Sequence, residues 1–252
     1  MCVKPFLIGL CFALLLTSCS TELKLADAFV DQSRQTQLAV YFPEEAQVTL
    51  VQDSDGTFTK VLDSVNQNAF LDIMYYAFAE EMERYGIQVY IPENQDNIKV
   101  DSIHWLAIFS KVEISGLYTE YVDHLYDFVD DYDFAFSLNT VNVASWVDIN
   151  DGIWHPVLYH EHNLTDGFES HVTGNNRQGM QYHYDIKELT KDDVYDYAVY
   201  LGKHYAGYVF DYMLDQYVSK ALKRQPGRTR LHWDPATSTW RDLLEDEGFV
   251  EL

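Results

Sequence analysis

Side chains that could bind a transition metal are concentrated in one short part of the sequence. The six candidate ligands that we single out there are His155, His160, Glu161, His162, His171 and His183. His160 and His162 are two residues apart, so on a β-strand both imidazoles would point to the same face, an arrangement that a zinc site can use. We therefore expect His160 and His162 to be candidate zinc ligands, with His171 or His183 as a third.

The same histidines also fit a simpler interpretation, as surface or interface residues in a loop-rich region. Glu161 would face the opposite side of the strand from its two neighbours. The sequence has no His-Glu-x-x-His motif and no carboxylate that can be identified as a partner of the imidazoles. The main expectation is therefore a protein without a cofactor, and zinc is the alternative.

Other catalytic chemistry has little support in the sequence. It contains no Gly-x-Ser-x-Gly motif and no glycine-rich phosphate loop before a helix. With forty acidic residues in the chain, no single pair of carboxylates identifies a catalytic site. The aspartate-rich stretches at 123–133 and 148–152 do not match a calcium-binding loop. We predict no catalytic residues and a protein that is not an enzyme; a metal-dependent hydrolase using His160 and His162 is the alternative.

Tyrosine is the other residue type that could form a binding site. Seven of the 19 tyrosines lie close together near the C-terminus: Tyr195, Tyr197, Tyr200, Tyr205, Tyr208, Tyr212 and Tyr217. One narrow stripe of a helix cannot bury so many rings, and a tyrosine combines an apolar ring with a polar tip that suits a cleft or an interface. Tyr205, Tyr208 and Tyr212 are thus predicted to bind another envelope protein or a glycan; the alternative is that they are core rings with hydrated hydroxyls.

Two helices and several strands must position these residues. Apolar residues at three- and four-residue spacing predict a helix over 68–85 that ends at Gly86, and a long helix over 190–222 that begins with a Thr190–Asp193 capping box. Gly202 and Gly207 in the long helix indicate close approach to a sheet or another helix. Strands are predicted at 38–42, 48–51, 87–92, 103–109, 112–119, 134–149, 154–159 and 181–186, with a loop over 173–179.

Two of these strands have unusual apolar patterns. The run over 103–109 is almost wholly apolar, which predicts burial on both faces, whereas residues 112–119 alternate and should be buried on one face. The two halves of 134–149 alternate in opposite phases, and a bulge near Asn139 would reconcile them. The order of elements fits an α+β fold: a mainly antiparallel sheet with an early helix and a long C-terminal helix packed on one face.

The fold is expected to form one domain over residues 38–222. Residues 19–37 are polar without sustained periodicity, which indicates a tether. Residues 223–252 combine a basic cluster with an acidic end, and we expect this polar tail to pack loosely or to be disordered.

The N-terminus has the layout of an export signal over residues 1–18: one positive charge, Lys4, precedes a short apolar run over 6–16. The run is about half as long as a membrane-spanning helix. The sequence Leu16-Thr17-Ser18-Cys19 resembles the lipobox of bacterial lipoproteins, which implies cleavage before Cys19 and a lipid on its sulfur. Cys2 and Cys11 would be removed with the signal, so the mature chain could form no disulfide and must rely on its core.

Charge and location narrow the choice of partners. Forty acidic and 17 basic residues give a net charge of −23, which repels phosphate backbones, so nucleic-acid binding is not expected. The lipobox implies a protein of the cell envelope that is held at a membrane by its lipid, and we expect the outer membrane of a Gram-negative bacterium. The element order is also vaguely similar to periplasmic accessory lipoproteins, which implies a non-enzymatic binding or accessory role in envelope assembly or transport.

Overall fold

The computed structural model describes residues 21–50, 61–92, 100–101, 104–126, 131–152, 156–175, 179–227, 229–243 and 248–252. The expected signal peptide, Cys19 and His155 lie outside these residues. A helix over 21–33 comes first. The elements after it are β1 (Gln37–Tyr41), β2 (Gln47–Leu50), the short 3-10 helix η1 (Val61–Ser64), α2 (Gln67–Arg84), β3 (Gln88–Tyr90), β4 (His104–Tyr126), β5 (Asp131–Asn150), β6 (Leu158–Thr165), β7 (Gly167–Asn175), β8 (Gly179–Lys187), α3 (Lys191–Leu222), β9 (Leu231–Asp234), β10 (Thr239–Asp242) and β11 (Val250–Glu251).

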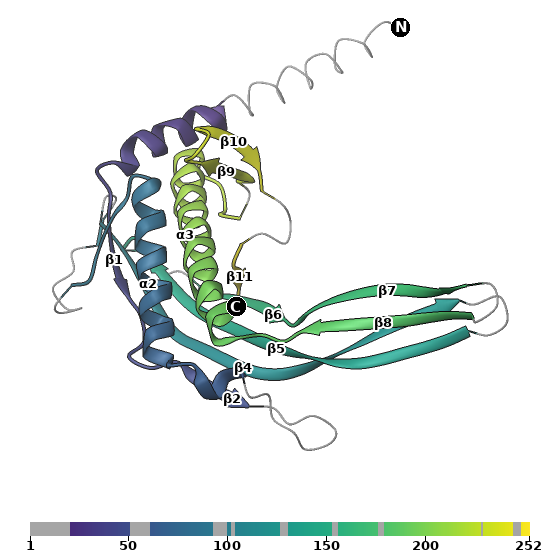
Figure 1. Cartoon of the computed structure of the whole chain (residues 1–252). Helices are drawn as coiled ribbons and strands as arrows, with labels where there is room; N and C mark the ends of the chain where they lie inside the picture. The colour runs from purple at the N-terminus through teal and green to yellow at the C-terminus, as the bar shows by residue number, and fades with distance from the viewer. Residues whose placement is uncertain are drawn as a thin grey trace, which may run out of the picture.

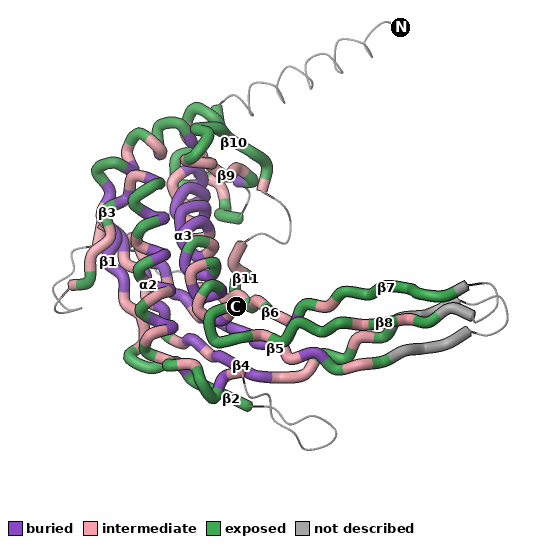
Figure 2. The backbone as a smooth tube through the Cα atoms, viewed as in Figure 1, coloured by how far each residue is buried: buried purple, intermediate pink, exposed green. Residues whose placement is uncertain are grey.

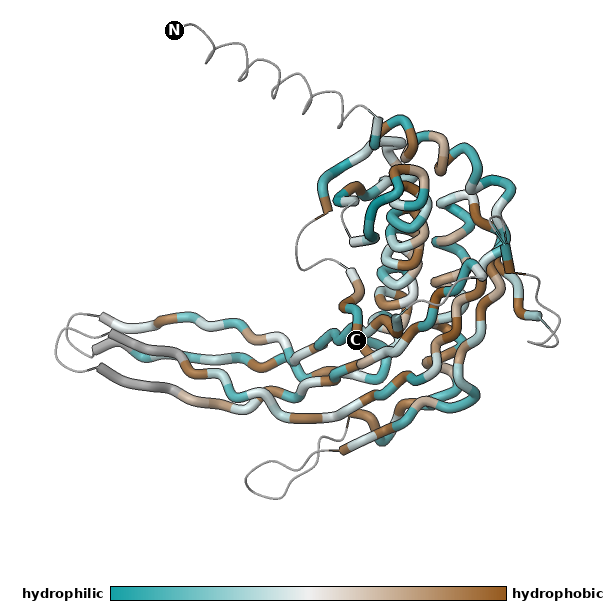
Figure 3. Tube along the Cα trace, turned by 180° about the vertical axis from the view of Figure 1, so that it is seen from behind, coloured by the Kyte–Doolittle hydropathy of each residue, from teal (hydrophilic) through white to brown (hydrophobic). Residues whose placement is uncertain are grey.

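The main sheet is mixed, and its longest strands are antiparallel. Its order is β11-β6-β5-β4-β1-β3, and β2 also pairs with β4. Strands β4, β5, β6 and β11 are antiparallel neighbours, whereas β1 and β2 run parallel to β4 and β3 runs parallel to β1. With α2 and α3 on one face, this arrangement confirms the predicted α+β class (Figures 1 and 3).

Both long helices were predicted correctly, and the local signals that predicted them are present. Helix α3 begins with the capping box, in which Thr190 and Asp193 bond each other's backbone. Gly86, at φ +86°, follows the end of α2 in a conformation that suits glycine. Helices α2 and α3 approach most closely at Gly202, where an added Cβ would lie 2.9 Å from the Phe78 nitrogen. The predicted close approach at Gly202 is therefore confirmed.

Strand β5 changes its buried side without a bulge at Asn139. Its pairing with β4 is continuous there, and the register shift lies between Phe109 and Lys111 instead. The phase changes because the cover changes: Val141 and Val143 belong to the core beneath the helices, whereas Phe136 packs on β7 and β8. The predicted bulge is wrong because two different elements cover the two halves of one regular strand.

The apolar run in β4 is not buried on both faces. Trp105, Ala107 and Phe109 are buried, but the intervening residues Leu106 and Ile108 are only partly buried. The reason is that helices cover one face of this part of the sheet, as Figure 1 shows. The apolar composition of this run predicted that other elements would cover both of its faces, but in the structure only one face is covered by the helices.

The outer halves of β4 and β5 continue beyond the body and form an arm with the β7–β8 hairpin (Figure 1). Rings of Tyr121 and Phe136 pack on Phe168 of β7, with centroids 4.6 and 5.4 Å away. Figure 2 shows that the described surface of the arm is mostly exposed or half-buried, in contrast to the body. Strand β7 also covers residues 173–175, which were predicted as loop.

Both ends of the described chain are folded onto the body. Ala26 and Phe29 of helix 21–33 are buried, so this stretch of the expected 19–37 tether is part of the domain. The expected loose tail forms the β9–β10 hairpin and β11, and Trp240 Nε1 donates a hydrogen bond to Asp27 at 2.8 Å. Arg224 and Glu22 form a second link between the two ends, at 2.9 Å. No helix in the described part of the chain is both long and apolar enough to cross a membrane.

Candidate functional site

Strand β6 presents His160 and His162 on one face, as their spacing predicted. Their ring centroids are 4.1 Å apart. Glu161 points to the other face, where it accepts hydrogen bonds from the Asn142 amide and the Tyr159 hydroxyl. The strand alternation therefore separates a carboxylate–amide network on one side from an imidazole pair on the other.

Burial keeps both imidazoles neutral. It lowers the pKa of His162 to about 4, with smaller contributions from His160 and His204, and it lowers the pKa of His160 as well. His160 Nδ1 and His162 Nε2 are buried, and neither has a hydrogen-bond partner among the described residues. At neutral pH these two nitrogens can therefore offer a lone pair or an N–H to a ligand, depending on the tautomer.

Helix α3 adds a third histidine and two tyrosines to this pair. The Tyr208 ring lies 4.9 Å from that of His160, and the His204 ring lies 5.7 Å from that of His162. Tyr200 packs on His204 with centroids 4.0 Å apart. We call these five residues the histidine–tyrosine cluster. The sequence interpretation missed His204, although its four-residue spacing from Tyr200 and Tyr208 places all three on one face of a helix.

His171 and His183, the expected additional ligands, belong to the arm and not to this cluster. They lie opposite each other on β7 and β8, with rings stacked 4.9 Å apart. Within the described ranges, no three His, Cys, Asp or Glu side chains are arranged to hold a metal ion. The structure thus brings together His160 and His162 with His204, and it separates them from His171 and His183.

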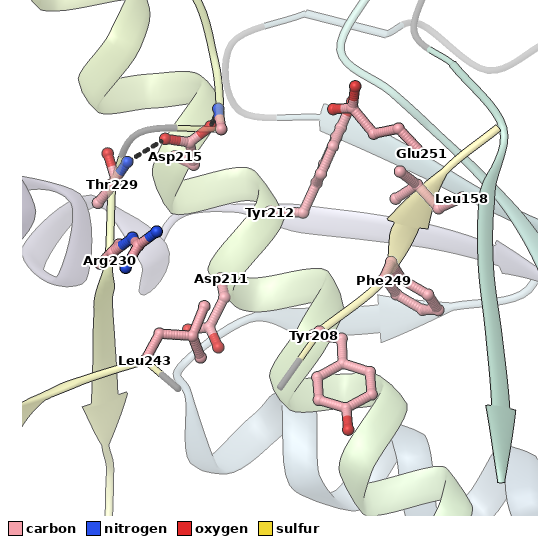
Figure 4. Close-up of a pocket in the computed structure, with 12 residues that line it drawn as sticks. Leu158, Tyr208, Asp211, Tyr212, Asp215, Thr229, Arg230, Leu243, Phe249 and Glu251 are labelled. Carbon is pink, nitrogen blue, oxygen red and sulfur yellow. Dashed lines mark hydrogen bonds between the residues drawn. The ribbon is translucent and has the colours of Figure 1, made fainter. Parts of the chain in front are cut away.

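The three tyrosines predicted to bind have different environments. Tyr205 is completely buried and stacks on Phe249, so its ring belongs to the core. Tyr208 and Tyr212 line a cavity of about 410 Å³ between α3 and the C-terminal segment, which we call the first cavity (Figure 4). Two of the three therefore occupy the kind of position that their chemistry predicted.

The first cavity is acidic on its helix side. Asp211 and Asp215 line it from α3, Glu251 lines it from β11, and Arg230 contributes the opposing charge (Figure 4). Asp215 accepts hydrogen bonds from the backbone nitrogens of Gly227 and Thr229, the latter at 2.8 Å, so it holds the loop after α3 in place. Asp211 accepts from His232 Nδ1 at 2.8 Å. Both aspartates are therefore partly occupied by structural contacts.

Two further cavities lie along α3, and the third lies between the first and the second. The second, of about 500 Å³, lies between the first turns of α3 and the base of the arm, and Tyr197, Tyr200 and His162 line it. The third, of about 330 Å³, lies beside the β9–β10 hairpin and shares Tyr208 with the first cavity and Tyr200 with the second. The histidine–tyrosine cluster thus separates three hollows on one face of one helix.

This arrangement is suited to holding a ligand. Half-exposed rings, neutral imidazoles and fixed carboxylates can bind a ligand through stacking and hydrogen bonds. Sequence comparison adds no assignment: no known protein family matches the chain, and comparison with curated proteins finds no relative.

Proposed function

We propose that this protein is a lipid-anchored, non-enzymatic binding protein of the bacterial cell envelope, which holds a glycan or protein partner along the face of α3 that carries Tyr200, His204 and Tyr208. The observation that carries the proposal is the run of three adjoining cavities on that face, separated by the histidine–tyrosine cluster. Binding sites are concave, contain aromatic side chains and have a few fixed polar groups, and this face has all three properties.

The charge of the chain limits what the partner can be. The net charge of −23 disfavours nucleic acid and other polyanions. A neutral glycan, or a neutral or basic protein surface, meets no such repulsion. An accessory role in envelope assembly or transport fits either partner.

The anchoring part of the proposal rests on the lipobox and is tested by Cys19→Ala. We expect the variant to lose membrane association while its circular dichroism spectrum stays unchanged, because the substitution removes the attachment point of the lipid and keeps every residue of the described fold. Membrane fractions washed with high salt distinguish lipid anchoring from electrostatic adsorption. A variant that stays fully in the washed membrane fraction would refute the anchor.

The binding part is tested by photo-crosslinking in cells. A benzoylphenylalanine placed at Lys203, an exposed residue on the rim of the third cavity, should give a defined crosslinked product. The same probe at Tyr76, a 70% exposed residue on α2, is the matched control and should not. Tyr208→Ala should abolish the Lys203 product, since it removes the ring shared by two cavities. Identical products from both probe positions would contradict a site on α3.

A zinc-dependent hydrolase or zinc-binding protein is the second candidate. It is supported by the two buried imidazole nitrogens of His160 and His162 that lack partners among the described residues, and by their neutral state, which is the form that binds metal. Elemental analysis of the purified protein should then give near-stoichiometric zinc that disappears in a His160→Ala, His162→Ala double variant. Zinc content that is negligible, or equal in both proteins, would remove this candidate.

A further inference from the structure

We propose that the second cavity is a binding site for a neutral saccharide, whose ring stacks on Tyr200 while its hydroxyls bond the polar groups around it. This inference rests on the proposed binding function and names the ligand class for one of its three cavities. The cavity volume of about 500 Å³ lies within the range of small-ligand sites. Its walls come from the end of β6, the two ends of the β7–β8 hairpin and the first turns of α3.

The walls of the second cavity are fixed before any ligand arrives. Asp166, which connects β6 to β7, is buried and accepts hydrogen bonds from the backbone nitrogens of Asn139 and Leu189, both at 2.7 Å. These contacts tie the base of the arm to β5 and to the segment that leads into α3. A preorganised wall reduces the entropy that a weakly held ligand must overcome.

Tyr200 provides a flat and accessible aromatic surface. Its side chain is 44% exposed, while its ring packs on His204 and lies parallel to Tyr197, with centroids 6.0 Å apart and an interplanar angle of 15°. A ring that is supported by its neighbours and still 44% exposed suits the flat C–H face of a pyranose. An organic cation is usually held by several rings that surround it, and here the neighbouring tyrosine ring is parallel to Tyr200 and cannot enclose such a ligand.

The polar groups of the cavity are suited to hydroxyls. Lys187 and Asp196 line the cavity and are exposed, so Lys187 offers a donor and Asp196 offers an acceptor. Tyr197 and His162 also line the cavity, with the Tyr197 hydroxyl and His162 Nε2 buried in its wall. Saccharide hydroxyls both donate and accept, so one ligand can bond both Lys187 and Asp196, which neither a pure cation nor a pure anion can do.

The charges of the lining disfavour an anionic ligand. Lys187 is the basic residue among the lining residues, and Glu188, Asp193 and Asp196 are acidic. An acidic saccharide would meet this excess of carboxylates and the field of the whole chain. A cation would lie beside the positive charge of Lys187. A neutral sugar avoids both costs.

The test is isothermal titration calorimetry on the full-length protein in detergent. The probes are cellobiose, maltose, lactose and N,N′-diacetylchitobiose, with choline as the cationic comparison and glucuronic acid as the anionic one. At least one neutral disaccharide should bind in the millimolar range or tighter. Tyr200→Ala should weaken that binding about tenfold by removing the stacking surface. Asp196→Ala removes the acceptor and should weaken it about three- to tenfold. Tyr76→Ala is the matched control and should bind as the wild type does.

The proposal is overturned if no disaccharide binds, if choline or glucuronic acid binds more tightly, or if Tyr200→Ala and Asp196→Ala both bind like the wild type. Circular dichroism of each variant excludes misfolding as the cause of lost binding. Failure here is distinguishable from failure of the proposed function, because the Lys203 crosslink reports on a partner of any class. A crosslink without saccharide binding would leave the envelope-binding function and remove the saccharide.

Discussion

Replacing Gly202 by alanine should destabilise the protein, although alanine is the better helix former. In the interior of α3 the change alone would stabilise the helix by about 1 kcal/mol. The added methyl group, however, would overlap the carbonyl oxygen of Met74 and lie 2.9 Å from both the Ala77 Cβ and the Phe78 nitrogen of α2. Two of these three atoms are backbone and cannot rotate away, so the helices must separate by about 1 Å to restore ordinary contact.

Such overpacking costs about 3 kcal/mol, which leaves a net loss of about 2 kcal/mol. Gly207→Ala is the matched control, because there the new Cβ would lie 3.4 Å from the Tyr85 hydroxyl and 3.8 Å from His232 Cε1. We expect Gly207→Ala to be neutral or to stabilise by up to about 1 kcal/mol. Urea unfolding followed by circular dichroism measures both variants. An unfolding midpoint for Gly202→Ala at or above the wild-type value would refute the close helix contact as the reason for glycine at this position.

Three further outcomes follow from buried or capping groups. Asp166→Ala should cost about 2 kcal/mol, since it leaves part-buried donors of Asn139 and Leu189 without their acceptor. Asp185→Ala on the arm, where the side chain is 79% exposed, should change the melting temperature little. Thr190→Ala should cost about 1 kcal/mol in thermal or urea unfolding, because it removes the cap of α3. Hydrogen bonds from Thr190 lower the pKa of the Asp193 carboxyl. The stabilisation that this carboxylate gives the fold is therefore complete above its usual pKa of 3.8, and it is lost as the pH falls through the lower pKa of the folded state. Asp193→Asn should be destabilising at pH 7 and should match the wild type in acid. A variant whose deficit persists unchanged in acid would contradict this assignment.

Local sequence signals predicted the elements whose stability is local. The capping box at Thr190 and the helical spacing through Leu222 predicted α3, and strand alternation predicted the shared face of His160 and His162. Helix 21–33 was missed because its apolar stripe is short and becomes stable only against α3, where Phe29 packs on Phe210 with centroids 5.3 Å apart. The parallel pairing of β1 and β2 with β4 joins segments far apart in the chain, and no local pattern encodes such a choice.

The site was predictable in its parts more than in its assembly. The tyrosine-rich face of α3 was recognisable from spacing, and two of its three predicted rings line a cavity. The sequence could not predict which histidines lie together, because that depends on which strands pair in the folded protein. His171 follows His162 by nine residues but lies on a separate two-stranded sheet, whereas His204, 42 positions from His162 in the sequence, is its neighbour in space.

Helix α3 sets the distance between the two ends of the molecule. Its 32 residues span roughly 48 Å, from the base of the arm to the turn where Arg224 meets Glu22 of helix 21–33. In Figures 1 and 3 helix 21–33 and the arm lie at opposite ends of the body. A lipid on Cys19 would leave at most about 7 Å of chain before that docked helix. In that case the length of α3 would set the distance of the arm and the second cavity from the bilayer. The short connection to the lipid would limit how far the body can move relative to the membrane.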